Sequence, residues 1–308
     1  PWRLDWPMRW VYESVDFEPG GKDHSSQGGS YSTGKELVKD IYNGEAPIYL
    51  QYDFVMIKGG SGKMSSSSGE VVTVNDVLDV YEPEILRYIF ASYKTNIDFS
   101  VSFDLDVIKI YEDFDRMERL AYGLETGNEK KVAMAKRVHE LSLVSEKPGR
   151  CPIQPSFRHL CNILQINEGD LDKTKEYYKK EILNPWDERR FDNRSKCALF
   201  WLENYAPEDF KYKLHNEPQQ LELNSSQNKF FNVLHEDLKT NWHNFKTDKD
   251  LHERLYEIMH SIDGLAPSDI FPKVYLSLIG KEKGPKLAGF IKTIGQEKAL
   301  KLIARTNS

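Results

Sequence analysis

The stretch PIYLQYDFVMIKG, residues 47–59, decides the fold of the first part of this chain. Every second residue from 48 to 56 is apolar or aromatic: Ile48, Leu50, Tyr52, Phe54 and Met56. An apolar period of two is typical of a β-strand. Upstream, WVYESVDFEPGGKDH (10–24) predicts a second short strand that ends in a glycine-rich turn. Between them, Ser32 or Thr33 caps a helix predicted over 35–42, which stops at Gly44. This order of elements predicts an α/β sheet.

Beyond Val74 the apolar period changes to three and four residues, which predicts helices. The clearest stripe runs through DLDVIKIYEDFDRMERLAYGL (104–124), and PEILRYIFASY (83–93) begins with a proline that a first helical turn accepts. Further helices are predicted at 129–145, 170–183, 195–204, 226–240, 249–262, 271–279, 285–294 and 296–304. Two polar or proline-rich joints, at 147–155 and 216–228, interrupt this series. The predicted fold class is therefore an α/β part followed by a mostly α-helical bundle region.

The composition is that of an ordinary soluble protein. The 308 residues are 39% hydrophobic and 29% charged, with a formal net charge of -6, and the length suggests two or three domains. No apolar run approaches the roughly 18–20 residues of a membrane helix, and no signal peptide is visible. The chain begins at Pro1 with the aromatic-rich PWRLDWPMRW, which leads us to expect a piece of a longer protein.

The cysteines predict a reducing, cytoplasmic setting, because an odd number at no framework spacing does not suit disulfides. They are Cys151, Cys161 and Cys197. His159 lies close to two of them, but the spacing is not that of a zinc knuckle, so we predict buried thiols and no metal site. Local lysine clusters, among them Lys281, Lys283, Lys286 and Lys292, are expected to be solvated helix faces.

The segment GGSGKMSSSSGEV (59–71) directly follows the predicted strand. Gly/Ser-rich composition alone favours a flexible linker. The same residues also suit a phosphate-binding loop, because glycine lets the backbone approach a ligand, serine donates hydrogen bonds and lysine supplies a charge. Its place after a strand is where α/β sheets hold ligands. Both interpretations stay open on composition.

This loop resembles the KMSKS signature of class I aminoacyl-tRNA synthetases, in the serine-rich form of the lysine-specific class I branch. WRLDWPMRW (2–10) and FEPGGKDHSSQGGSY (17–31) resemble the same branch, in the same order. The C-terminal LHERLYEIMHSIDGL (251–265) and IFPKVYLSLIGKEKGPKLAGFI (270–291) are similar to the end of that family. The resemblance thus spans nearly the whole chain. The first class I signature, of His-x-Gly-His type, is absent, which fits a C-terminal portion that is inactive alone.

The resemblance implies three regions. Residues 1–75 would be the C-terminal part of a Rossmann-like nucleotide-binding domain, 76–150 a helical connector, and 151–308 an α-helical anticodon-binding domain. The implied activity is that of a lysine–tRNA ligase: lysine and ATP, with Mg²⁺, give lysyl-adenylate, and the lysyl group then passes to tRNA(Lys). The implied protein is a cytoplasmic monomer without a membrane partner.

By the resemblance, the loop stabilises the departing pyrophosphate. Lys63 supplies the charge, Ser65, Ser66 and Ser67 donate hydrogen bonds, and Met64 packs the loop; ATP contacts are expected from 63–66. Most of the class has a second lysine at the fourth signature position, where this chain has Ser66. Lys58 is the candidate to replace that lysine.

A lysine substrate needs carboxylate or aromatic surfaces around its ammonium, because an unpaired buried charge is unfavourable. The candidates are Trp2, Asp5, Trp6, Glu18, Asp23, His24 and Tyr31. We favour His24 with Trp2 or Trp6. Gly28 and Gly29 would allow close backbone approach to the substrate. As structural alternatives, two of the three tryptophans at 2, 6 and 10 are expected in the core, and Asp5 could pair with Arg3 or Arg9.

Two other functions stay open: a tRNA-binding helical module without catalysis, and a class I synthetase for glutamate or cysteine. Acidic and aromatic candidates near residues 2–31, rather than arginines aimed at a side-chain carboxylate, favour lysine over glutamate.

Overall fold

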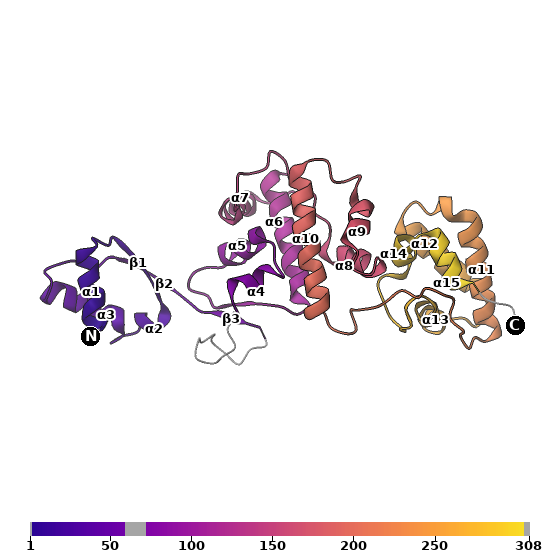
Figure 1. Cartoon of the computed structure of the whole chain (residues 1–308), viewed down its shortest axis with the longest axis horizontal. Coiled ribbons are helices and arrows are strands. Elements are labelled where there is room, and N and C mark those ends of the chain that lie inside the picture. The colour runs from indigo at the N-terminus through magenta and orange to yellow at the C-terminus, as the bar shows by residue number, and fades with distance from the viewer. Residues whose placement is uncertain (1, 59–71, 305–308) are drawn as a thin grey trace. The chain divides into compact units, whose positions relative to one another are not determined.

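The computed structural model describes residues 2–58 and 72–304. The chain divides into two compact units, Pro1–Cys151 and Pro152–Ser308, which are treated separately below. In both units the described residues are mostly helical, and the strands form small parallel sheets (Figure 1). No helix in the described ranges has the length and apolar character to span a bilayer.

The first unit begins with a helix, where the sequence analysis predicted nothing regular before residue 10. Its first elements are α1 (Trp2–Tyr12), β1 (Phe17–Gly21), α2 (Lys22–Ser25), α3 (Ser30–Asp40) and β2 (Ile48–Tyr52). The strand predicted within 10–24 is therefore confirmed only for its second half. The predicted helix starts earlier than expected, at Ser30, with Gly29 as its N-cap in place of Ser32 or Thr33.

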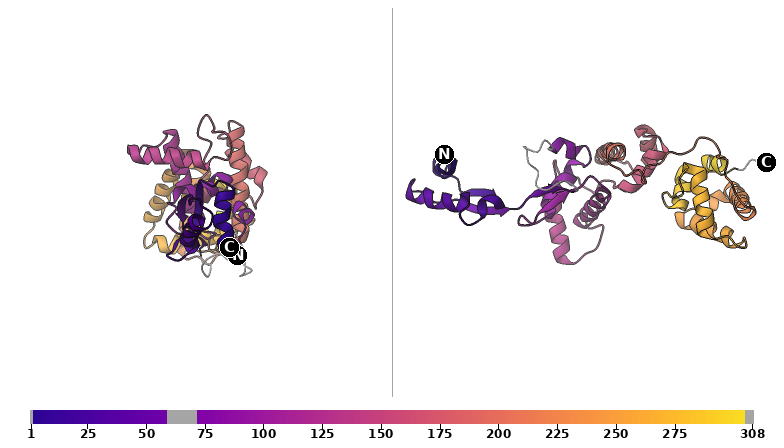
Figure 2. Two further views of the ribbon diagram at one scale, coloured as in Figure 1. Left: turned by 90° about the vertical axis from the view of Figure 1, so that its left-hand side faces the viewer. Right: turned by 90° about the horizontal axis from the view of Figure 1, so that it is seen from below.

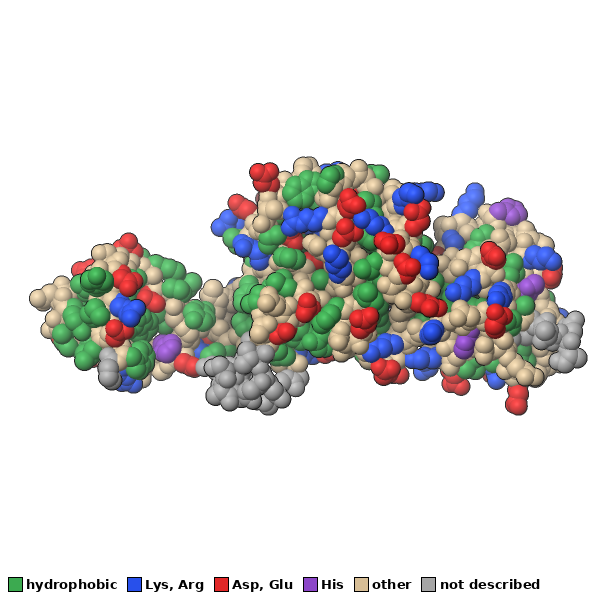
Figure 3. Space-filling model, viewed as in Figure 1, with side chains coloured by type: hydrophobic (Ala, Val, Ile, Leu, Met, Phe, Trp, Pro, Cys, Tyr) green, Lys and Arg blue, Asp and Glu red, His purple; other side chains and the backbone are tan. Residues whose placement is uncertain are grey.

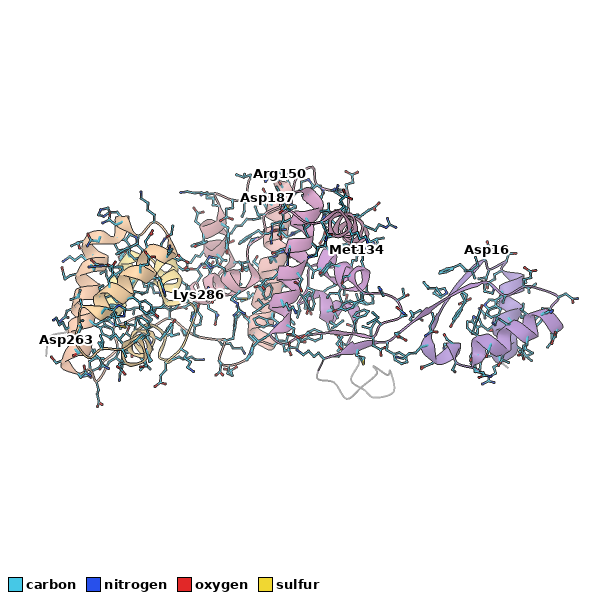
Figure 4. All side chains as sticks on the ribbon, turned by 180° about the vertical axis from the view of Figure 1, so that it is seen from behind. Asp16, Met134, Arg150, Asp187, Asp263 and Lys286 are labelled. Atoms are coloured by element: carbon cyan, nitrogen blue, oxygen red, sulfur yellow. The ribbon has the colours of Figure 1, made fainter. Side chains whose placement is uncertain are left out.

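Strands β1 and β2 pair in parallel, with Phe17 opposite Ile48 and Gly21 opposite Tyr52. The pairing starts where the Ile48 amide donates to the carbonyl of Asp16, which Figure 4 labels, at 2.9 Å. Gly20 is required here, because a Cβ would lie 1.9 Å from the Tyr49 hydroxyl. Apolar side chains stay at the surface of these elements (Figure 3), and Ile48 is 75% exposed.

The strand predicted from 48 to 56 is interrupted, because the backbone changes partners at Asp53 and Phe54. The Asp53 amide donates to the Thr95 carbonyl, and the Phe54 amide donates to the Asp98 carboxylate, both at 2.8 Å. The chain then forms β3 (Val55–Ile57), which pairs in parallel with β4 (Phe99–Val101). The described strands thus form two separate two-stranded sheets instead of one continuous sheet.

Four helices complete the first unit: α4 (Val74–Leu78), α5 (Pro83–Ser92), α6 (Asp106–Tyr122) and α7 (Glu129–Ser142). The stripe predicted for 104–124 is confirmed, because α6 buries its apolar face against α5 and α7. Gly123 ends α6 in the left-handed conformation, with φ of 73°. Tyr81 and Tyr111 stack inside this core, with ring centroids 6.0 Å apart.

The second unit is helical throughout its regular structure. It contains α8 (Phe157–Ile166), α9 (Leu171–Tyr178), α10 (Pro185–Asn204), α11 (Ser225–Asn241), a 3₁₀ turn η1 (Trp242–Asn244), α12 (Asp248–His260), α13 (Pro267–Ile279), α14 (Leu287–Ile294) and α15 (Gln296–Ile303). Helices α11–α15 gather in one bundle (Figure 2), around a core that includes Phe230, Phe231 and Ile291.

Two features of the second unit differ from the sequence prediction. Helix α8 was not predicted. Of the thiols predicted to be buried, Cys161 and Cys197 are buried, whereas Cys151 is only half-buried. Helix α10 begins ten residues before the predicted 195, at Pro185, and the Asn184 side chain accepts hydrogen bonds from the amides of Trp186 and Asp187.

We expect Gly34→Val to destabilise the first unit. Gly34 lies on α3 against α1, and a Cβ there would be 2.8 Å from the Trp10 ring. A larger side chain must displace that buried ring, and overpacking of this kind costs about 1–3 kcal/mol. Urea unfolding of the chain measures the loss. Gly149→Val is the matched control, because a Cβ at Gly149 meets nothing within 4 Å. Equal unfolding free energies for the two variants would contradict the expected displacement of the Trp10 ring.

Candidate functional site

Three tryptophans line one face of α1, because positions 2, 6 and 10 are spaced by four residues. Their ring centroids are 6.2 Å apart between Trp2 and Trp6, and 5.0 Å apart between Trp6 and Trp10. Burial increases along the row: Trp2 is 52% exposed, Trp6 is half-buried and Trp10 is 2% exposed. The expectation of two core tryptophans is therefore wrong, since only Trp10 is buried.

His24 closes this aromatic row from α2. Its ring stands edge-on to Trp2 at 6.0 Å and to Trp6 at 5.9 Å between centroids. Trp2, Trp6 and His24 border a cavity of about 410 Å³, which we call the N-terminal cavity. Its remaining lining comes from the acidic and basic pair on α1, the end of β1 and the end of β2: Asp5, Arg9, Pro19, Gly20, Gly21 and Tyr52.

The charged part of the N-terminal cavity is an ion pair. Arg9 Nε donates to Asp5 Oδ2 at 3.0 Å across one helical turn, and both side chains are exposed. The structural alternative for Asp5 is thus confirmed with Arg9 as its partner. Chemically, the cavity combines flat aromatic faces, an imidazole and one carboxylate, a set that suits a cation or a planar ring.

Glu18 and Tyr31 have structural roles beside the N-terminal cavity. The Glu18 carboxylate accepts a hydrogen bond of 3.0 Å from the indole of buried Trp10. Tyr31 stacks on Tyr49 at 3.7 Å between ring centroids and donates to the Pro47 carbonyl at 3.2 Å. Burial raises the pKa of the Tyr31 hydroxyl, with a smaller contribution from Tyr49. Tyr31 is not part of the cavity lining.

The other predicted substrate contacts lie on or after α2. Asp23 precedes His24 in the helix and is not among the residues that line the N-terminal cavity. Gly28 adopts φ of 74°, and Gly29 caps α3. A Cβ at Gly29 would lie 2.7 Å from the Ser26 carbonyl oxygen, so the close approach in the structure is to the protein's own backbone.

The predicted phosphate-binding loop lies outside the described residues. This holds for Lys63, Met64, Ser65, Ser66 and Ser67, all within 59–71. The last described residue before it, Lys58, forms an ion pair with Asp104 at 2.9 Å and another with Asp106. Hydrogen bonds to Asp106 and Asp104 raise the pKa of Lys58. Because two carboxylates already bind this ammonium, the geometry does not favour Lys58 as a second phosphate-binding cation.

A second lysine joins the two sheets of the first unit. The Lys22 ammonium contacts both Asp98 oxygens at 2.9 Å and lies 3.5 Å from Asp53 Oδ1. It also lies 4.6 Å from the Phe54 ring centroid. Sequence reasoning missed this residue, and it missed Arg9 and Tyr52 as cavity neighbours. The i,i+4 spacing that suggested Arg9 as a partner of Asp5 was a signal for Arg9 alone, and neither Lys22 nor Tyr52 had a comparable local signal.

The comparisons with known proteins agree with the resemblance seen in the sequence. Residues 1–145 match the family described as tRNA synthetases class I (K). The chain is 47% identical over 306 residues to the lysine–tRNA ligase of Borreliella burgdorferi, with 99% of this chain and 58% of that protein covered. For the lysine–tRNA ligase of Treponema pallidum the identity is 41% over 305 residues, covering 98% and 57%.

Archaeal relatives show the same coverage. The lysine–tRNA ligase of Pyrococcus furiosus is 37% identical over 302 residues, with 96% of this chain and 57% of that protein covered. The chain thus spans less than three fifths of the length of the curated relatives that it matches. The resemblance to the lysine-specific class I synthetases is confirmed.

We expect Asp104 to make the first unit acid-sensitive. Burial opposes its ionisation, but hydrogen bonds from Ser102, the Asp106 amide and Lys58 outweigh it and lower its pKa to about 2 from 3.8. A lowered folded-state pKa adds stability above pH 4, which is lost as the pH falls towards 2. Urea titrations should therefore show Asp104→Asn destabilising at pH 5, with a difference from the parent that shrinks steadily as the pH falls from 4 towards 2. The control is Asp40→Asn, at an exposed position, whose unfolding free energy should differ from that of the parent by the same amount at every pH. If the difference between Asp104→Asn and the parent were also independent of pH, the Asp104 carboxylate would be excluded as the cause.

Proposed function

We propose that this chain is part of a class I lysine–tRNA ligase, which activates lysine with ATP and transfers the lysyl group to tRNA(Lys). The observation that carries the proposal is the similarity to enzymes of that name along nearly the whole chain. The N-terminal cavity supports it, because aromatic and carboxylate groups meet there as lysine recognition requires.

Within this function, residues 1–75 would belong to a Rossmann-like nucleotide-binding domain. The parallel pairing of β1 with β2 supports this assignment, since parallel sheets occur in α/β domains with covered faces. The exposed apolar side chains on these strands, such as Ile48 and Phe17, support a larger sheet than the two strands described. Residues 76–150 would then be the connector, and 151–308 the anticodon-binding domain.

We assign lysine to the N-terminal cavity. The ammonium would lie against the faces of Trp2 and Trp6, where a cation–π contact contributes about 0.5–2 kcal/mol. The Asp5 carboxylate would contact both Arg9 and the substrate ammonium, since the ion pair between Asp5 and Arg9 is exposed and weak. His24 is placed to fix the position of the substrate's lysine side chain, because its ring already contacts Trp2 and Trp6. Asp23, Tyr31, Gly28 and Gly29 remain proposed contacts, although none of them lines the N-terminal cavity as described.

Pyrophosphate departure is the step we assign to the loop at 59–71. Charge develops on the leaving group, and a lysine with several hydroxyl donors aimed at it stabilises the transition state more than the ground state. Lys63 would provide the charge and Ser65–Ser67 the donors, while Met64 and Ser66 complete the contacts to ATP. Mg²⁺ would arrive with the ATP phosphates, as is usual for this ion. We further propose a cytoplasmic monomer, a setting that the free thiols support.

Lys63→Ala in the intact ligase tests the loop. We expect adenylation to fall on the order of 10²-fold with little change in lysine affinity, because the lost interaction forms only in the transition state. Lysine-dependent ATP–pyrophosphate exchange measures it, with Lys39→Ala on the exposed face of α3 as the control. An unchanged exchange rate in Lys63→Ala would remove the proposed role of this residue.

His24→Ala tests the cavity. We expect lysine affinity of the intact ligase, measured by calorimetry, to fall about tenfold, because a typical lost polar contact of 1–1.5 kcal/mol corresponds to that factor. His243→Ala, at an exposed position of the second unit, should bind lysine as the parent does. Undiminished affinity of His24→Ala would place lysine elsewhere.

The alternatives are separated by one experiment. Pyrophosphate exchange with the intact protein across all twenty amino acids should respond to lysine. A response to glutamate or cysteine would favour another class I synthetase, and no response would favour a tRNA-binding module without catalysis.

A further inference from the structure

The Lys22 ammonium lies where the two sheets of the first unit meet, and the function described so far gives it no role. It contacts Asp98 Oδ1 and Oδ2, both at 2.9 Å, and it lies 3.5 Å from Asp53 Oδ1. We call these three residues the inter-sheet joint. An ammonium has three N–H donors, and the three carboxylate oxygens account for them. Lys22 is therefore not a free cation for a substrate phosphate, and its role lies in what it connects.

One side of the inter-sheet joint is the N-terminal cavity. Gly21, directly before Lys22, and His24, two residues after it, both line that cavity. Asp53 comes directly after Tyr52, which lines the same cavity. Two of the three residues of the joint are thus direct chain neighbours of the cavity lining.

The other side of the inter-sheet joint is the second sheet. Asp98 directly precedes β4, and its carboxylate accepts the amide of Phe54, directly before β3, at 2.8 Å. The Phe54 ring centroid lies 4.6 Å from the Lys22 ammonium. After β3 the chain reaches Lys58, whose amide donates to the Val101 carbonyl at 2.9 Å, and the loop at 59–71 follows directly. The joint thus attaches the strand that leads to this loop.

Both partners of the main ion pair carry their charges at neutral pH. The hydrogen bond to Asp98 raises the pKa of Lys22, and the same bond, followed by that from the Phe54 amide, lowers the pKa of Asp98. The two side chains are 33% and 38% exposed. An ion pair of this exposure contributes little to the free energy of unfolding. Its main effect is therefore expected on geometry.

The Asp53 carboxylate makes this geometry depend on Lys22. Its side chain is only 15% exposed, and within the described residues its Oδ1 atom has no hydrogen-bond partner. Lys22 is the cation that lies beside this oxygen. A carboxylate that is withdrawn from water and uncompensated is unfavourable. Without the Lys22 ammonium, we expect the connection from β2 to β3 to shift until the carboxylate reaches water.

Helix α2 has a second attachment, which does not involve Lys22. The Ser25 hydroxyl donates to the Gly21 carbonyl at 3.0 Å and lies 2.9 Å from the Tyr49 hydroxyl. The contacts of the His24 ring with the tryptophans of α1 are also independent of the joint. Loss of the Lys22 ammonium should therefore leave the N-terminal cavity assembled and change the placement of the second sheet.

We propose that Lys22 is a positioning residue for lysine activation, which through Asp98 and Asp53 sets the place of β3 relative to the N-terminal cavity. The inference rests on the proposed function, in which the cavity holds lysine and the loop after β3 acts on ATP. Reacting atoms must come within about 3–3.5 Å of each other, and a misplacement of about 1 Å can lower the rate about 10²-fold. Since Lys22 contacts neither substrate in this scheme, its loss should lower kcat and spare lysine affinity.

Lys22→Met in the intact ligase tests the proposal. We expect kcat of lysine-dependent ATP–pyrophosphate exchange, at saturating lysine and ATP, to fall at least about tenfold. The dissociation constant for lysine, measured by calorimetry, should stay within about threefold of the parent value.

The matched control is Lys175→Met in the second unit. The Lys175 side chain is 34% exposed, close to the 33% of Lys22, and its ammonium also pairs with two carboxylates, Glu188 at 2.7 Å and Asp192 at 3.0 Å. Its kcat of exchange should stay within about twofold of the parent, because a lost surface ion pair by itself has little effect. An equal loss of kcat in the two variants would overturn the specific role of Lys22.

Two further variants distinguish positioning from a general loss of structure, and they decide the question if Lys22→Met does not fold. Lys22→Arg should recover kcat to within about threefold of the parent, because a guanidinium can bind the Asp98 carboxylate through two hydrogen bonds. Asp98→Asn keeps an oxygen for the Phe54 amide and should lower kcat as Lys22→Met does.

The double variant Lys22→Met/Asp98→Asn should lose no more kcat than the more affected single variant, because both changes remove one contact. Additive losses would overturn the proposal. So would an unchanged kcat in Lys22→Met, a Lys22→Arg variant as slow as Lys22→Met, or a loss of lysine affinity in place of kcat.

The exchange rate of the parent protein separates this inference from the proposed function. Lysine-dependent exchange by the parent with an unchanged kcat in Lys22→Met would overturn the positioning role and keep the ligase. A parent that responds to another amino acid, with the expected loss in Lys22→Met, would keep the positioning role and overturn the assignment to lysine. A parent that exchanges with no amino acid would overturn both.

Discussion

The first unit depends on the contacts around one carboxylate, that of Asp98. It accepts the Phe54 amide and both of its oxygens contact the Lys22 ammonium, so it ties the end of the first sheet to the start of the second. Charge-assisted hydrogen bonds of this kind are about twice as strong as neutral ones. Together with the hydrogen bond from the Asp53 amide to the Thr95 carbonyl and the pairing of β3 with β4, this contact sets the path of the chain from β2 to β3. The N-terminal cavity lies beside these contacts, because its lining residues Gly20 and Gly21 directly precede Lys22.

Local sequence pattern predicted those elements whose burial is one-sided. Helix α6 was recognised because its apolar residues face α5 and α7 and its polar residues face water. The first half of α10 was missed because Asp187, Arg190 and Arg194 are buried there, so polarity no longer marks the solvent side. Helix α1 has a proline inside it and exposed apolar residues, which obscure the period. The break between β2 and β3 depends on Thr95 and Asp98, more than forty residues away, and no local pattern contains it.

The candidate site likewise contains residues whose position could be predicted from sequence and residues whose position could not. Trp2, Asp5 and His24 were grouped from sequence by the chemistry of their side chains and by the resemblance, and the structure places all three at one cavity. The position of Tyr31 could not, since its stacking on Tyr49 follows from the register that sets Glu18 opposite Tyr49. The phosphate-binding role of the loop rests on its residue types and on the similarity to synthetases. Lys283 and Lys286 are exposed, as expected from sequence, but they lie with Lys281 in a loop before α14 that borders a cavity, and not on a helix face.

The bonds of Lys281 set the shape of the cavity that the loops at 209–212 and 281–286 border. Its ammonium fastens the loop at 281–286 to the carbonyls of Glu208 and Lys211, and the Tyr275 hydroxyl donates to the Pro285 carbonyl. Both edges of the cavity are therefore shaped before anything arrives. Such preorganisation moves the entropy of ordering from the binding step to folding. A ligand of this cavity would adapt its own conformation to a rigid receptor, and selectivity would be set by which molecule can adopt the required shape with the smallest free-energy cost.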